Sequence, residues 1–360
     1  MTVTAPDHAP VTEVPKSSGT RLVDRVFKMR ELAILAVFLV MIAITQAGNS
    51  EFLSEQGIKD LLLNATILVL VATGQAMVVI TRNVDLSVGS TLGISAFATG
   101  LYLQGGGNSV VAVALAVLLG IGFGLLNGLL VSLGQVPALV VTLGTLYIIR
   151  GIDSIWVGSR QITAADLPGG FVDFGSGGLS AVPWLAMIAL VVLVATAYYL
   201  KHYGSGREMY ALGSNPEAAR LAGIPVRKRI LIAYTFCGGL AGLAGAMYLA
   251  RFGNVDSGTG NGYELTVVSA VVVGGVVFTG GSGSVYGAAL GALLLTSINS
   301  VLPALGVSSV WVLAINGILL ILAIAVDRIV ALRVASALKK KSAAARTTAA
   351  PVKKGDAGHA

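Results

Sequence analysis

The stretch Arg207–Arg229, REMYALGSNPEAARLAGIPVRKR, is the longest polar, charge-bearing segment between two extensive apolar regions. Its residues define a short helix with a clear start and end. Asn215 can cap the helix and Pro216 suits its first position, while Gly223 can end it in a left-handed conformation. A helix this short cannot hold itself together in water. The sequence therefore predicts that it lies against another surface.

On both sides of this stretch the chain is apolar enough to cross a membrane. Its 360 residues are 11% charged, whereas soluble domains carry about 25% charged residues. No Asp, Glu, Lys or Arg occurs in residues 86–149 or 265–326. Each gap can hold about three spans of roughly 20 residues. The predicted fold class is an all-α polytopic membrane protein.

The net charge of +7 reflects membrane topology rather than nucleic-acid binding. Basic residues beside spans mark cytoplasmic ends, and a lipid bilayer is the expected partner of the apolar regions. The basic residues gather before the first predicted span, in the central loop and after the last span: Arg21, Arg25, Lys28, Arg30, Lys201, Arg207, Arg220, Arg227, Lys228, Arg229, Arg328, Arg333, Lys339, Lys340 and Lys341.

About ten spans follow from the apolar segments, with both termini and the central loop 201–229 in the cytoplasm. We expect a cytoplasmic tail over 1–30, a transmembrane domain over 31–329 and a basic C-terminal tail over 330–360. The predicted spans are 32–47, 61–80, 86–103, 110–133, 138–157, 182–200, 230–250, 265–278, 285–302 and 310–326. A faint repeat, Ser87–Gly93 against Ser284–Gly291, indicates two related halves, as in transporters built around broken helices.

Asp85 follows the second predicted span and can be interpreted in two ways. It could line a polar translocation path together with Asn83 and Ser87, because charges at membrane depth usually serve a function. It could equally cap the next helix at the cytoplasmic interface, where Arg82 would extend toward water. The residues alone leave both interpretations open.

Five amides lie within apolar runs and are further candidates for a path that binds the hydroxyls of a solute. Hydrogen bonding between helices is the alternative. These residues are Asn64, Gln75, Asn127, Asn299 and Asn316. Glycines at four-residue spacing are predicted to be packing faces; they are Gly120, Gly124 and Gly128, and Gly283, Gly287 and Gly291.

Catalytic and metal-binding patterns are absent from the sequence. The three histidines are dispersed, and no G-x-x-x-x-G-K-[ST] motif occurs, so the phosphate cradle of an ATPase is missing. Cys237, the single cysteine, is expected to be a buried, inert thiol. We expect no enzymatic activity, no metal and no cofactor.

Four segments resemble the permeases of bacterial ABC importers for sugars, a family that includes the ribose, xylose, arabinose, galactoside and autoinducer-2 importers. The similarity extends from about Leu32 to about Ile329. The matching segments are Asn83–Ser90, Val136–Thr145, Gly206–Pro225 and Phe278–Gly287.

The resemblance implies a plasma-membrane permease that pairs with a second copy or a sister permease. It also implies a cytoplasmic ATPase dimer, which binds the ATP, and an extracytoplasmic sugar-binding protein. In these permeases the matching loop docks on the ATPase. The residues at the positions of that coupling helix are Gly213, Asn215, Pro216, Glu217, Ala218, Ala219, Arg220, Gly223 and Ile224.

Two functions from different classes remain open at this point. One is a passive conduit worked by ATPase partners. The other is a secondary transporter driven by an ion gradient, with Asp85 as its coupling site.

Overall fold

The computed structural model describes residues 18–304 together with residues 306, 308, 311, 314, 315, 317, 318, 321, 322 and 325. Most of this part of the chain is helical, and it contains one short two-stranded sheet. The long helices are α1 (Ser18–Gly48), α2 (Glu55–Ile80), α3 (Val88–Gln104), α4 (Ser109–Ser132), α5 (Ala138–Val157), α7 (Trp184–His202), α10 (Val226–Phe252) and α12 (Val285–Ala304). The shorter elements are η1 (Ala164–Asp166), α6 (Gly169–Ser176), β1 (Gly178–Leu179), β2 (Val182–Pro183), α8 (Gly204–Ser214), α9 (Pro216–Leu221) and α11 (Tyr263–Val273).

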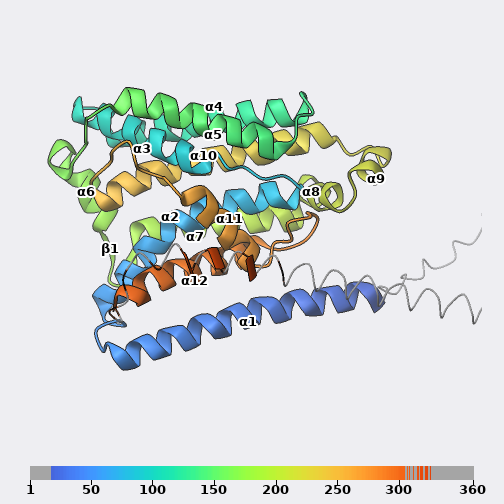
Figure 1. Cartoon of the computed structure of the whole chain (residues 1–360), viewed down its shortest axis with the longest axis horizontal. Helices are drawn as coiled ribbons and strands as arrows, with labels where there is room; N and C mark the ends of the chain where they lie inside the picture. Colours follow the sequence, from blue (N-terminus) through green and yellow to red (C-terminus); the bar gives the residue numbers. More distant parts are fainter. Residues whose placement is uncertain are drawn as a thin grey trace, which may run out of the picture.

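The helices form a bundle with two distinct ends (Figure 1). We call them the α9 end, where α8 and α9 lie, and the α6 end, where α6 and β1 lie. In the described part of the chain, six helices are long and apolar enough to cross a membrane. This confirms the predicted all-α polytopic class. The tenth predicted span, 310–326, and the C-terminal tail lie largely or wholly outside the described residues.

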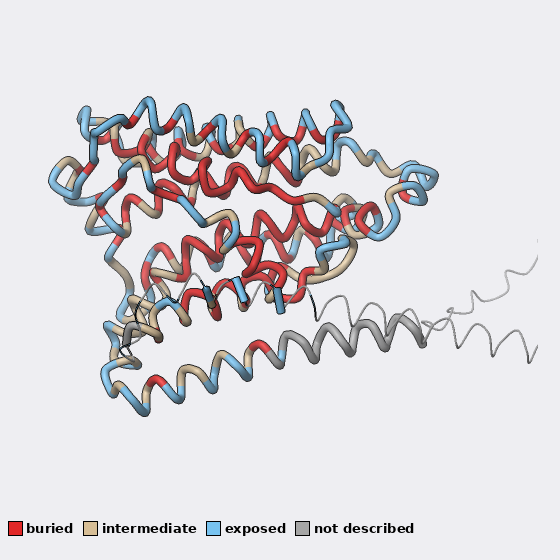
Figure 2. The backbone as a smooth tube through the Cα atoms, in the orientation of Figure 1, coloured by how far each residue is buried: buried red, intermediate tan, exposed pale blue. Residues whose placement is uncertain are grey.

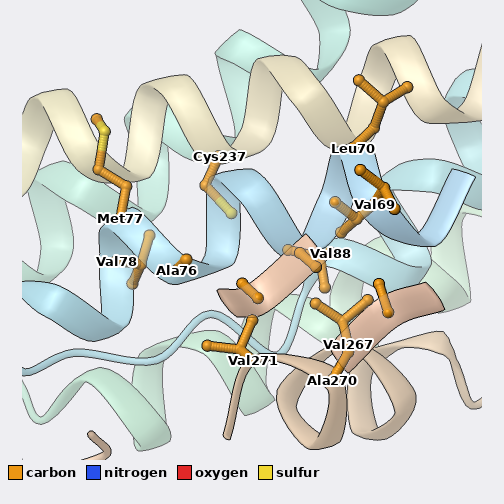
Figure 3. Packing of buried hydrophobic residues seen from close by; sticks show 14 of the residues in the cluster. Val69, Leu70, Ala76, Met77, Val78, Val88, Cys237, Val267, Ala270 and Val271 are labelled. Carbon is orange, nitrogen blue, oxygen red and sulfur yellow. The ribbon is translucent and has the colours of Figure 1, made fainter. Parts of the chain in front are cut away.

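Helix α2 forms the centre of the bundle. Within its most apolar window 94% of the residues are buried, against 22% for α4, and Figure 2 shows this contrast between centre and periphery. A helix that is apolar all round belongs in a protein interior. Figure 3 shows side chains of α2, such as Val69 and Met77, in one cluster with Cys237 of α10 and Val267 of α11. The prediction that Cys237 is buried is confirmed.

Two antiparallel helix pairs pack closely through glycines. A methyl group at Gly120 of α4 would overlap the backbone of Gly238 in α10, and one at Gly124 would overlap the carbonyl of Tyr234. On the other side, Gly287 of α12 lies against Gly274, at the end of α11. Small residues let helix backbones approach in this way. The interpretation of the glycine strips as packing faces is confirmed, except that Gly283 precedes α12, in a loop, with φ +115°.

Two of the predicted spans are short helices that begin after breaks in the bundle. The first break runs from Thr81 to Ser87 and leads into α3, and the second runs from Gly253 to Gly262 and leads into α11. The second break reaches the start of α3, because Gly260 packs against Gly89. The eighth predicted span, 265–278, ends early at Val273 because Gly274 and Gly275 follow, the latter at φ +93°. Within a membrane, non-helical backbone is tolerated only where protein or a water-filled cavity provides hydrogen-bond partners for its N–H and C=O groups.

The central polar stretch forms two helices and the start of a third, where the sequence predicted one. The predicted helix is α9; α8 precedes it and was missed. Helix α10 begins at Val226, so Arg227, Lys228 and Arg229 belong to its first turn rather than to a loop. The second span is also longer than the predicted 61–80, because α2 begins six residues earlier, at Glu55, where Ser54 caps it by accepting a hydrogen bond from Gly57 N at 3.1 Å.

Candidate functional site

Helix α9 is shaped by the caps that its sequence predicts. Asn215 Oδ1 accepts hydrogen bonds from the N–H groups of Glu217 and Ala218, both at 3.1 Å. Pro216 occupies the first turn, and Gly223 adopts φ +79° beyond the C-terminal end. These bonds satisfy backbone groups that a helix end leaves without partners. The chain thereby holds a two-turn helix in a fixed shape without burying most of it.

The outer surface of α9 faces away from the bundle. Ala219 is buried against the protein, whereas Glu217, Ala218 and Arg220 are exposed. Leu221 is 89% exposed, the highest exposure among the large apolar side chains that the structure describes. The sequence analysis did not include Leu221 among the docking residues. The sequence did contain a signal for this residue, because Leu221 is the only bulky apolar side chain in α9.

Helix α8 fastens α9 to the helical core. Glu208 of α8 forms an ion pair with Arg229 of α10, with 2.6 Å between Oε2 and Nε. The hydroxyl of Tyr210 donates to the carbonyl of Gly283 at 3.1 Å. Burial raises the pKa of Tyr210 to about 12, so its hydroxyl remains a donor across the physiological range. These two bonds connect the segment before α9 to α10 and to the loop before α12.

Gly213, at the end of α8, lies against the end of α2, where the first break begins. It packs against the carbonyl of Ile80, the last residue of α2, and against Gly281. Gly281 N donates to that same Ile80 carbonyl at 2.9 Å. The end of α8, the end of α2 and the loop at Gly281 therefore meet at Ile80, five residues before Asp85. The structure joins Gly213 directly to the segment that carries the other group of candidate residues.

Asn83 is also close to α9. It lines a cavity of about 700 Å³ at the α9 end that is shared with Arg220 and Ile224. The remaining lining residues are Val131, Ser132, Gln135, Val136, Pro137, Ala138, Pro225, Val226, Arg227, Lys228 and Ile230. Arg82, beside it, is exposed, as expected for a side chain that extends toward water.

Asp85 lies at the centre of a buried hydrogen-bond network. Its Oδ1 accepts from Ser87 N at 2.9 Å, from Ser87 Oγ at 2.7 Å and from Asn127 Nδ2 at 3.4 Å. Asn127 Nδ2 also donates to Ser87 Oγ at 2.8 Å. All three side chains are at most 1% exposed. The network fixes the break between α2 and α3 and ties it to α4, and Asp85 is bonded to Ser87, the residue that precedes α3.

Backbone groups of the same break are satisfied from two other helices. The hydroxyl of Tyr234 in α10 donates to the carbonyl of Val84 at 2.9 Å. In the amide orientation that satisfies both groups, Gln75 of α2 bonds the N–H and the carbonyl of Asp85, each at 3.2 Å. Buried backbone groups need such partners. The break is thus a defined conformation rather than a flexible loop.

The five candidate amides separate into two groups. Gln75 and Asn127 are fully buried and bond the Asp85 break. Asn64 and Asn299 line a different cavity, near the α6 end of α2 and α12. Asn316 lies outside the described residues. Gln75 and Asn127 make hydrogen bonds between helices, which was the alternative interpretation of these amides. The roles of the candidate amides in a translocation path remain predictions.

A buried charged cluster was missed by the sequence analysis. Arg150 of α5 donates to the carbonyl of Thr259 at 2.7 Å and lies 3.8 Å from Asp153. Glu264 lies close by, beside Gly89. Asp153 is fully buried, and neither of its carboxylate oxygens has a hydrogen-bond partner among the described residues. The signal was visible, because Arg150 and Asp153 stand inside the predicted span 138–157.

These features define a polytopic α-helical membrane protein with broken helices in its core and an exposed, firmly held helix at one end. Within the described residues no group of three or more His, Cys, Asp or Glu side chains could hold a metal ion. The chain belongs to the family described as the permease component of the branched-chain amino acid transport system, whose pattern matches residues 57–324.

Relatives with established names support this membership. The autoinducer 2 import system permease protein LsrC of Salmonella paratyphi B is 37% identical over 295 residues, covering 81% of this chain and 84% of the relative. The ribose import permease protein RbsC of Escherichia coli K12 is 35% identical over 315 residues, covering 86% of this chain and 97% of the relative. No solved structure is significantly similar.

Proposed function

We propose that this chain is the membrane permease subunit of an ABC importer and forms the path for a ribose-like sugar, a related polyol or autoinducer-2. The names of its relatives support this substrate class. The absence of a phosphate-binding motif in the sequence supports a chain that relies on a separate ATPase. The protein is a multi-pass protein, and we place it in the cytoplasmic membrane of a bacterium.

The observation that carries the proposal is the geometry of α9. A short helix projects Leu221 and Glu217 outward, and it is tied through α8 to the breaks in the core. Clusters of basic residues mark cytoplasmic ends, and Arg220, Arg227 and Lys228 lie at this end. A cytoplasmic ATPase dimer would meet α9 there. We further propose ten spans in two related halves, with both termini in the cytoplasm.

The remaining partners follow from the same proposal. A second permease, identical or a sister chain, would complete the path, and an extracytoplasmic sugar-binding protein would deliver the solute at the α6 end. ATP closing the ATPase dimer would move α9 and switch the cavity between inward- and outward-facing states. The ion-gradient transporter is less favoured, because nothing in that mechanism requires an exposed helix coupled to the core.

Two variants of α9 test the docking role. We expect Glu217→Arg and Leu221→Asp each to abolish co-purification of the ATPase, because an exposed anchor at an interface centre contributes about 2 kcal/mol or more. Insertion into the membrane should persist. The measurement is pull-down of the ATPase with the tagged permease from detergent-solubilised membranes.

Matched controls are available at the α6 end. Asp173 and Leu179 are exposed there, so Asp173→Arg and Leu179→Asp repeat both changes away from α9. These controls should retain the ATPase. Full ATPase recovery with both α9 variants would show that the helix does not dock it.

A further inference from the structure

A second cavity lies near the α6 end, between α2, α12 and the segment that leads into α11. Its volume is about 380 Å³, within the range of roughly 300–1,000 Å³ typical of small-molecule sites. The residues that line it are Asn64, Leu68, Phe252, Asn261, Gly262, Tyr263, Thr266, Thr296, Asn299 and Ser300. Four separate segments of the chain therefore contribute to one lining.

The lining is rich in amides and hydroxyls that are available for a ligand. The side chains of Asn64, Asn261 and Asn299 make no hydrogen bond within the described part of the chain, nor does the Thr296 hydroxyl. Each amide offers both donors and an acceptor, and each hydroxyl offers both roles. Sugar hydroxyls also donate and accept, so such a lining matches them. Asn64 and Asn299 differ in this respect from Gln75 and Asn127, which are bonded between helices.

Aromatic rings form one side of this cavity. Phe252 packs on Tyr248 with 4.6 Å between ring centroids, and Tyr248 meets Tyr263 edge to face at 6.3 Å. Arg251 forms an ion pair with Asp60 at 2.9 Å, and neither residue belongs to the lining. A rigid apolar ring beside polar groups suits a solute with one C–H face and several hydroxyls.

Among the described residues that line this cavity, none carries a formal charge. An amino acid carries an ammonium and a carboxylate group, and neither would find a charged partner among the described lining residues. A neutral polyol needs no charged partner. The lining therefore discriminates between the two solute classes that the family description and the relatives' names suggest.

We propose that this cavity is a binding site for a neutral, polyhydroxylated solute such as a pentose, and that Asn64, Thr296 and Asn299 contact its hydroxyls. The inference rests on the proposed function. It places the bound solute in this cavity, near the α6 end of the bundle. It commits to a solute class that the fold by itself does not define.

Labelling of an introduced cysteine tests binding directly. Cys237, the only natural cysteine, is buried, so background labelling is low. In the complete transporter in detergent, Asn299→Cys should react with a polar methanethiosulfonate reagent. D-ribose at ten times its dissociation constant should slow that reaction about tenfold. L-leucine should not slow it.

The control is Leu179→Cys, which lies outside the cavity with its side chain 68% exposed; ribose should not alter its labelling. Equal labelling of Asn299→Cys with and without ribose would overturn the proposal. Protection by leucine but not by ribose would overturn it too, in favour of a zwitterion site.

Transport by variants separates this inference from the proposed function. In proteoliposomes with the ATPase and binding protein, Asn64→Leu and Thr296→Val should reduce ribose uptake per ATP hydrolysed by about tenfold each, which corresponds to a lost hydrogen bond of about 1.4 kcal/mol. Ser297→Ala, whose hydroxyl bonds its own helix at Leu293 O, should not change it.

The outcomes of the two arms are distinguishable. ATP-driven ribose uptake that is unchanged in both cavity variants refutes the cavity and leaves the permease function intact. A wild-type complex that takes up no ribose, autoinducer-2 or other polyol refutes the proposed substrate class, and the labelling result then decides the cavity independently. Loss of ATPase stimulation together with uptake would indicate a structural role and would contradict the proposal.

Discussion

Asp85→Leu is expected to abolish transport and to remove most of the folded protein from the membrane. The change deletes an acceptor for Ser87 N, Ser87 Oγ and Asn127 Nδ2, all in the core. Each buried polar group left without a partner costs about 1–3 kcal/mol. Asn127 Nδ2 keeps its bond to Ser87 Oγ, so two groups lose their acceptor, and the resulting cost of about 2–6 kcal/mol is a large share of the stability of many domains, about 5–15 kcal/mol. The measurements are uptake in cells and monodispersity of the solubilised protein on gel filtration.

Asp85→Asn is the matched variant, because an asparagine oxygen can accept the same bonds without a charge. We expect folded protein and near-normal ATP-driven uptake, since the carboxylate in this account fixes the break and does not carry an ion. A secondary transporter with Asp85 as its coupling site requires the opposite result. Loss of uptake in well-folded Asp85→Asn would therefore contradict the structural role assigned to the network.

Gly213→Ala should uncouple the transporter while leaving α9 in place. The added methyl group would overlap the carbonyl of Ile80 and the backbone of Gly281, so α8 must move away from the end of α2. Overpacking of this kind costs about 1–3 kcal/mol, and we expect uptake to fall about tenfold to a hundredfold. The ATPase should still co-purify. The measurement is ribose uptake per bound ATPase.

Gly204→Ala is the control in the same helix. A methyl group at Gly204 meets no atom within 4 Å, and this variant should transport normally. Normal uptake in Gly213→Ala would show that the contact between α8 and the α2–α3 break does not transmit the movement of the ATPase.

The sequence predicts those features that depend on local chemistry. The caps of α9 follow from Asn215, Pro216 and Gly223 alone, because a helix end is satisfied by its neighbours in the chain. The polytopic class follows from two long segments without charges. The packing role of Gly120 and Gly124 follows from their spacing.

Features that depend on contacts between distant segments were not predictable. Nothing local distinguishes Gln75 from Asn64, yet the first bonds the Asp85 backbone and the second lines a cavity with α12. The partner of Arg150 at Thr259 is 109 residues away. The early end of α11 is the exception, since Gly274-Gly275 could have revealed it.

The central claim, that a separate ATPase acting through α9 drives this permease, is tested most directly by solute uptake into liposomes. Purified permease alone should take up no ribose under a proton or sodium gradient. Addition of the ATPase, the binding protein and ATP should start uptake, and Leu221→Asp in α9 should stop it. Uptake driven by an ion gradient without ATPase, in the wild type and in Leu221→Asp alike, would contradict the account.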